Sequence, residues 1–139
     1  MKPTLEQVDQ YEVPSFLAER IAQIYQVPQD FADGLIFEAK RMLYLCAITD
    51  KSVAPSDRVD WAWHEMIMFT KFYKSYAEFL GDFIHHVPNP PESEKDPHET
   101  WEEIQEKLGR PRKEGETYTQ TKALYKKELG IDPDPLYWP

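Results

Sequence analysis

An acidic side chain and a histidine lie four residues apart in the segment from Pro55 to Thr70. On a helix, Asp60 and His64 would share one face, with their side chains within reach of each other. The residues around them are mostly large and apolar, a pattern typical of a helix that is buried on nearly all sides. A buried carboxylate and a buried imidazole each need a partner, and these two can supply one another. An imidazole held in this way has a fixed tautomer, which leaves its second nitrogen available for a proton or a metal ion.

Two adjacent histidines, His85 and His86, form a second candidate cluster. Neighbouring side chains point about 100° apart on a helix, so one metal ion takes both only where the backbone turns. One straight helix up to Gly81 would hold His64 about 25 Å from that glycine along the axis. The four residues that lead on to His85 would span at most about 14 Å. The pattern changes from apolar all round to amphipathic at Thr70, which favours a helix break there and would allow the histidines to meet.

Together, His64, His85, His86 and Asp60 predict a site for one divalent metal ion. Imidazole and carboxylate ligands suit zinc, iron, nickel or manganese, and such a set with an open position is typical of catalytic metal sites. No catalytic residue is assigned, and whether the chain is an enzyme stays open. The alternative is that the histidine motif is structural, with His64 bonded to Asp60 inside the core and His85-His86 capping a helix end. The chain would then be a non-enzymatic interaction module that binds a protein partner through its charged helices.

The histidines belong to a longer pattern of residues along the chain: Ala54-Pro55-Ser56, Val59-Asp60, Trp63-His64, Thr70, Tyr73, residues 81–88, Tyr118, Thr121, Tyr125, Gly130, Pro133 and Trp138-Pro139. This pattern resembles the glycine-rich-domain-containing-protein-like family, over about residues 31–139. The family is largely uncharacterised, so the resemblance implies a helix break near Thr70 but no reaction. In this chain Met66 stands where members often have a second histidine, Phe69 where some have aspartate, and Ala77 where some have cysteine. Positions 64 and 66 point about 200° apart on a helix, so Met66 alone does not abolish a site built on His64.

Other notable side chains have simpler interpretations. Cys46 lies on the apolar stripe of a predicted helix, as a buried structural thiol would. Glu38 lies beside that stripe and is expected in solvent, with an inward turn toward Arg41 or the histidines as the alternative. Trp61 and Trp63 are expected to pack in the core rather than stack on a ligand. The sequence has no phosphate-binding glycine-rich loop, no Gly-x-Ser-x-Gly and no His-Glu-x-x-His motif.

Helical periodicity dominates the sequence, and no segment alternates as a strand would, so the predicted fold class is all-α. We expect a single domain over residues 1–139, a compact bundle of about five or six helices with a docked C-terminal tail. The predicted helical segments are 15–26, 29–48, a region over 57–81 that breaks near residue 70, 99–108 and 117–129, with a proline-rich linker over 87–97. The predicted core comprises Phe31, Leu35, Met42, Trp63, Ile67, Phe72, Tyr73, Tyr76, Phe79 and Phe83.

Composition restricts the class of protein. Of 139 residues, 41% are apolar, which is enough for a buried core. Sixteen basic and 25 acidic residues give an acidic protein of net charge −9, which disfavours nucleic-acid and anionic-membrane partners. A single cysteine excludes an intramolecular disulfide, and no apolar run is long enough to span a bilayer. The start of the chain lacks the pattern of a signal peptide, so we expect a cytoplasmic protein, as a monomer or homodimer.

Overall fold

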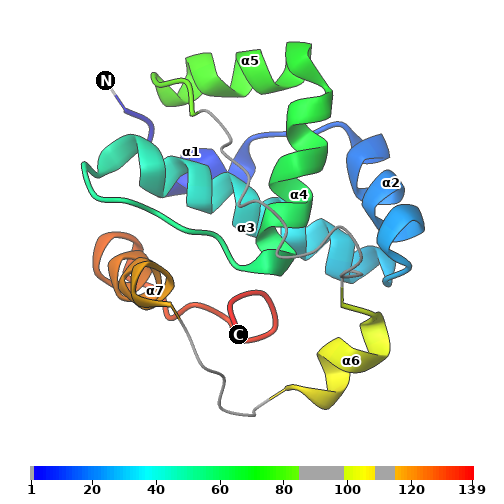
Figure 1. Ribbon diagram of the computed structural model, residues 1–139. Coiled ribbons are helices and arrows are strands. Elements are labelled where there is room, and N and C mark those ends of the chain that lie inside the picture. Colours follow the sequence, from blue (N-terminus) through cyan, green and yellow to red (C-terminus); the bar gives the residue numbers. More distant parts are fainter. Residues whose placement is uncertain (1, 85–98, 109–114) are drawn as a thin grey trace.

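The computed structural model describes residues 2–84, 99–108 and 115–139 (Figure 1). These residues form seven helices and no strand, so the predicted all-α bundle is confirmed, with more helices than expected. No helix in these three ranges is long and apolar enough to cross a membrane. The helices are α1 (Leu5–Gln10), α2 (Ser15–Tyr25), α3 (Gln29–Ile48), α4 (Asp57–Met68), α5 (Thr70–Leu80), α6 (Trp101–Glu106) and α7 (Glu116–Leu129).

Helix α3 is the centre of the bundle. It packs against α1, α2, α4 and α7, and Figure 1 shows it crossing the middle of the molecule. Its bounds agree with the prediction, because its apolar stripe is long and regular. Helix α2 ends at Tyr25, since Gln26 adopts a left-handed conformation with φ of 53°.

The sequence analysis did not predict α1. This helix has six residues, of which only Val8 is buried, so its apolar periodicity is too short to detect. Its start is nevertheless encoded by a capping box. The Thr4 hydroxyl accepts a hydrogen bond from the backbone N–H of Gln7, and the Gln7 side chain accepts one from the backbone N–H of Thr4.

The predicted break between α4 and α5 is confirmed. Ser56 begins α4 by accepting a hydrogen bond from the backbone N–H of Val59 (3.0 Å), and α4 ends at Met68. Phe69 leaves the helical conformation (φ −103°, ψ 77°), and α5 begins at Thr70. In Figure 1, α5 crosses the upper end of α4 instead of continuing it. The chain after α5 can therefore return toward α4, which a straight helix would forbid.

The C-terminal tail docks on the rest of the domain, as predicted, and the structure places it against the N-terminus of α4. Gly130 ends α7 with φ of 72°, and the tail then turns back. The Ser56 hydroxyl donates to the carbonyl of Tyr137 (2.6 Å), and Arg58 Nη1 donates to the carbonyl of Leu136 (2.8 Å). Helix α6 is shorter than predicted. The predicted linker over 87–97 lies outside the described residues.

Most of the predicted core is buried, with one clear error. Phe83 is 49% exposed, because α5 ends at Leu80 and Gly81 turns the chain with φ of 79°, so the helical stripe stops before residue 83. Ile67, Phe72 and Phe79 are half-buried and pack against the core from its edge. The six predicted residues that are fully buried are Phe31, Leu35, Met42, Trp63, Tyr73 and Tyr76.

Gly34 lies within α3, where glycine costs about 0.5–1 kcal/mol relative to alanine. A Cβ at residue 34 would overlap the hydroxyl of Tyr137, whose ring stacks on Phe31 with centroids 5.3 Å apart. We therefore expect Gly34→Ala to lower the free energy of unfolding by about 1–3 kcal/mol in urea denaturation, despite its better helix propensity. In a Tyr137→Ala background the same change should be stabilising; destabilisation in both backgrounds would contradict this account.

Candidate functional site

His64 lies on the surface of α4, so the prediction that it is buried is wrong. Helix α4 buries residues on several sides, but a strip one side chain wide faces solvent. On this strip Asp60 is half-buried, His64 is exposed, and Met68 is 58% exposed. These positions are spaced by four residues, as neighbours on one helix face are. The large apolar residues on either side hid this strip in the sequence pattern. His64 is therefore accessible to a metal ion, and a core role for it is excluded.

The adjacent face of α4 is fixed against α2. Trp61 stacks on Tyr25, with ring centroids 4.7 Å apart and an interplanar angle of 7°. Arg20 Nε donates to the buried carboxylate of Glu65 at 2.7 Å. The pKa of Tyr25 is raised to about 12, first by burial and then by the negative charges of Glu65 and Asp60. Asp60 thus lies close enough to Tyr25 for its charge to raise the pKa of the Tyr25 hydroxyl.

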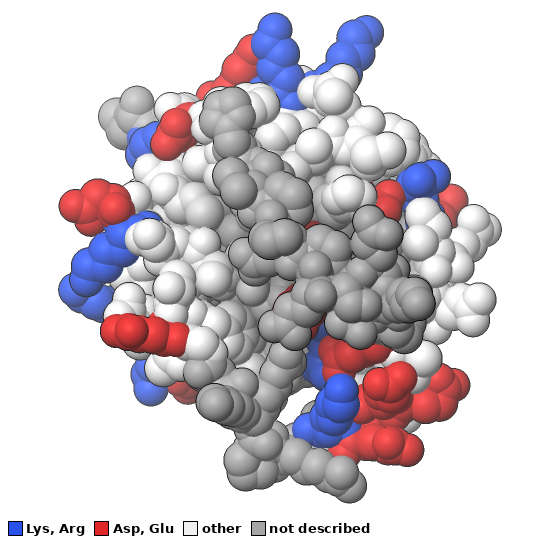
Figure 2. Space-filling model, viewed as in Figure 1, with Lys and Arg blue, Asp and Glu red and all other residues white. Residues whose placement is uncertain are grey.

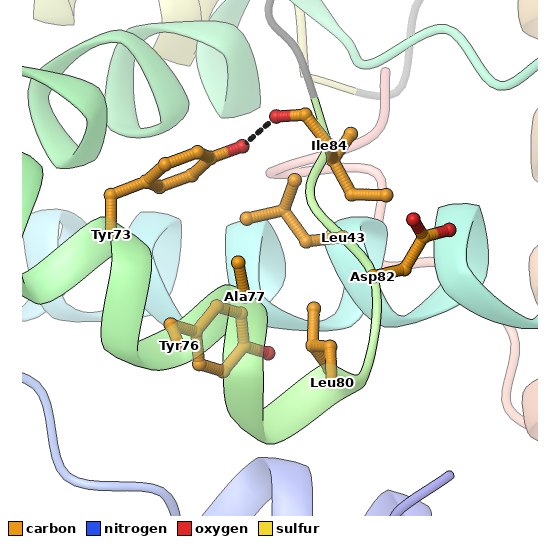
Figure 3. Close-up of a pocket in the computed structure, with 7 residues that line it drawn as sticks. All are labelled: Leu43, Tyr73, Tyr76, Ala77, Leu80, Asp82 and Ile84. Atoms are coloured by element: carbon orange, nitrogen blue, oxygen red, sulfur yellow. Dashed lines mark hydrogen bonds between the residues drawn. The ribbon is translucent and has the colours of Figure 1, made fainter.

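A chain of hydrogen bonds connects α4 to the segment after α5. The indole N–H of Trp63 donates to the hydroxyl of Tyr73 at 3.0 Å, and this hydroxyl donates to the carbonyl of Ile84. Figure 3 shows the Tyr73 ring reaching from α5 to that carbonyl, over a pocket that also involves Leu43 of α3. Trp63 precedes His64 in the sequence, and Ile84 precedes His85. The two segments that carry the histidines are thus joined through one tyrosine.

A surface groove provides a second link between these segments. Ile67, one helical turn after His64, lines the same groove as Ile84. His85 and His86 themselves lie outside the described residues. Within the ranges 2–84, 99–108 and 115–139, no group of three or more His, Cys, Asp or Glu side chains is placed to hold a metal ion. Among the described residues, the candidate site therefore consists of Asp60 and His64.

Glu38 is buried, contrary to the expectation that it lies in solvent. Its carboxylate is 6% exposed and accepts hydrogen bonds from the Tyr125 hydroxyl (2.7 Å) and the Trp138 indole (3.0 Å). Arg41 donates to the same Tyr125 hydroxyl at 2.9 Å and forms a bidentate pair with Asp9. The alternative, in which Glu38 turns inward, is therefore the one observed, and the Tyr125 hydroxyl connects its carboxylate to Arg41. This network connects α1, α3, α7 and the tail, and its groups are used in holding the fold together.

Cys46 does not form a reactive centre. It is half-buried, and burial raises the pKa of its thiol to about 12. The thiol therefore stays protonated at neutral pH and is a poor nucleophile. Its sulfur lies 3.8 Å from that of Met42, one turn earlier in α3, which agrees with the predicted structural role. Trp61 and Trp63 are also buried, 8% and 7% exposed, as predicted.

Comparison with known protein families matches residues 4–105 to the UCP032817-like family. The chain belongs to the UCP032817-like family. The matched region runs from the residue that caps α1 into α6, and it includes both histidine-bearing segments. This UCP032817-like match does not confirm the glycine-rich-domain resemblance, and it ends before the tail residues that were part of that resemblance. No curated protein and no solved structure gives a significant match to the chain.

Proposed function

We propose that this UCP032817-like chain binds one divalent metal ion through His64, Asp60, His85 and His86. The observation that carries the proposal is the hydrogen-bonded connection from Trp63 through Tyr73 to Ile84, the residue before His85. This connection holds the segment that follows α5 against α4, the helix that carries His64. The helix break at Phe69 removes the geometric objection that a straight helix would raise.

The donor set suits a borderline metal ion. His64 and Asp60 are one turn apart on a helix held by packing on both flanks, which is a common way to present two ligands to one ion. Imidazoles with a carboxylate favour zinc, iron, nickel or manganese over calcium and magnesium, which prefer oxygen ligands alone. A set of this kind with an open coordination position would give a site able to bind and polarise a substrate oxygen.

The second candidate, a protein-interaction module, is supported by a different surface. Phe16 on α2 is 46% exposed, and its ring packs edge-on against Phe69 with centroids 4.8 Å apart. Met68 beside Phe69 is 58% exposed. Exposed apolar side chains grouped in this way are typical of partner surfaces. This alternative also assumed that the histidine motif stabilises the core. The exposed position of His64 argues against that assumption.

Thermal denaturation with and without added metal tests the proposal. A ligand that binds only the folded chain stabilises it by about 2.7 kcal/mol at a concentration 100 times its Kd. For a chain of this size, that corresponds to a rise in Tm of roughly 5–15 °C. We expect this rise with zinc, iron, nickel or manganese in the wild type, and its reversal by a chelator.

Two histidine variants make the melting experiment specific. His64→Ala should lose the metal-dependent rise but keep the metal-free Tm, because exposed substitutions usually change stability by less than about 0.5 kcal/mol. His98→Ala, outside the proposed ligand set, should respond as the wild type does. An equal rise in the wild type and His64→Ala, or no rise with any of these ions, would refute the site.

A further inference from the structure

An open groove lies where α4, α5 and the following segment meet. Its volume is about 520 Å³, within the range of small-molecule binding sites. Its lining is mainly apolar, with two cationic side chains from α5. It is formed by Ile67 at the end of α4, by Thr70, Lys71, Tyr73 and Lys74 in the first turns of α5, and by Phe83 and Ile84 beyond α5. We propose that this groove binds an amphipathic organic anion, a small molecule with an alkyl or aryl body and an acidic head group.

The apolar part of the groove is rigid where it meets the core. The rings of Tyr73 and Phe83 pack edge to face, with centroids 5.4 Å apart and an interplanar angle of 85°. The Tyr73 hydroxyl is fixed between the indole of Trp63 and the carbonyl of Ile84. Phe83 remains 49% exposed, although it is large and apolar. An alkyl or aryl body bound beside it would remove that ring from water, which is favourable at about 25 cal/mol per Å².

The charges on α5 indicate that the ligand is negatively charged. Lys71 and Lys74 lie near its N-terminus and Glu78 in its last turn, the reverse of the arrangement that the helix dipole favours. The lysines are three residues apart, so they also repel each other on one face. In the part of the chain that the structure describes, neither lysine forms an ion pair. An anion bound beside their ammonium groups would offset both the repulsion between the lysines and their unfavourable position near the helix N-terminus.

The location of these charges on the molecule supports the same conclusion. The protein carries a net charge of −9, whereas the lining of the groove contains two lysines and no acidic residue. In Figure 2 two positive side chains project from the upper edge, where Figure 1 places α5, with an acidic side chain beside one of them, and most of the acidic side chains in this view gather near α6 at the lower right. The size of the groove favours a small molecule, because seven residues line it, whereas a stable protein interface takes roughly 20–30 residues from each partner.

Calorimetric titration with decanoate and with decanol, at concentrations below micelle formation, tests the proposal. The full chain is used with a chelator present, so that the outcome does not depend on the proposed metal site. We expect saturable binding of one decanoate per chain and weaker binding of decanol. The Lys71→Gln/Lys74→Gln double variant should bind decanoate about five- to tenfold more weakly and decanol unchanged. Phe83→Ala should weaken binding of both ligands.

Lys126→Gln is the matched control, since Lys126 is an exposed lysine on α7 that is paired with Asp132. It should bind decanoate as the wild type does, and higher salt should weaken decanoate binding only where Lys71 and Lys74 are present. No saturable binding, equal affinity of the wild type for the two ligands, or an equal loss in Lys126→Gln would overturn the proposal. Binding of an acidic peptide but not of decanoate would also overturn it, and would make the groove a protein-docking surface.

Discussion

Replacing Trp138 with alanine is expected to lower the free energy of unfolding by about 3–5 kcal/mol, a large part of the stability of a small domain. Trp138 is 2% exposed, and its ring packs against Tyr125 and Tyr118 of α7, with centroids 5.5 and 6.3 Å away. Its indole also donates to Glu38 Oε2. The substitution therefore opens a cavity between α3, α7 and the tail and removes a hydrogen bond to a buried carboxylate.

Two comparisons separate these effects in urea denaturation. Trp138→Phe keeps an aromatic ring but not the N–H, so it should cost less than the alanine substitution. Ile131→Ala, in the same tail at a residue 37% exposed, should change stability by less than about 0.5 kcal/mol. If Trp138→Ala proved as mild as Ile131→Ala, the tail would not be part of the folded core.

Arg58→Ala is expected to have a similar effect, a loss of about 3–5 kcal/mol. Arg58 is 2% exposed and holds two distant parts of the chain to α4. Its Nε and Nη2 donate to both carboxylate oxygens of Glu99 (3.0 and 3.2 Å), and its Nη1 donates to the carbonyl of Leu136. Removing the guanidinium takes the bidentate partner from the largely buried Glu99 carboxylate, which keeps only the longer contact from the exposed Lys107 (3.3 Å) among those described, and takes the Arg58 donor from the Leu136 carbonyl. Lys126→Ala, which breaks an exposed ion pair, is the control and should cost less than about 0.5 kcal/mol.

The pH dependence of stability distinguishes loss of the ion pair from loss of packing. Burial by itself would raise the pKa of Glu99, but its hydrogen bonds to Arg58 and the charges of Arg58 and Lys107 lower that pKa below its usual value of 4.5. The pair therefore contributes full stability above about pH 4.5, and the contribution is lost as pH falls through the lowered pKa. Arg58→Ala and Glu99→Gln should both lack this part of the acid sensitivity. An unchanged pH profile in both variants would contradict a role for the ion pair.

The parts of the fold that follow from local pattern were predictable from the sequence. Helix α3 has a long apolar stripe, and the change of pattern at Thr70 marks the break between α4 and α5. Helix α1 escaped detection because a six-residue helix with one buried side chain has no measurable periodicity. Phe83 was misplaced because the stripe of α5 extends past Gly81 in sequence, although the helix does not.

The parts that depend on tertiary contacts were not predictable. The bonds from Tyr125 and Trp138 to Glu38 join residues 87 and 100 positions apart, and no local pattern encodes such partners. The spacing of Asp60 and His64 correctly predicted a shared helix face. The many apolar neighbours suggested that this face is buried. A polar strip one residue wide contributes too few residues to show against the apolar majority of the helix.

Elemental analysis of purified, untagged protein tests the proposed metal site most directly. Wild type and His64→Ala are compared after incubation with zinc, iron, nickel and manganese in turn and removal of unbound ion, with His98→Ala as the control. The account predicts about one metal ion per chain in the wild type and in His98→Ala, and little or none in His64→Ala. Absence of metal from all samples, or equal metal in wild type and His64→Ala, would contradict it.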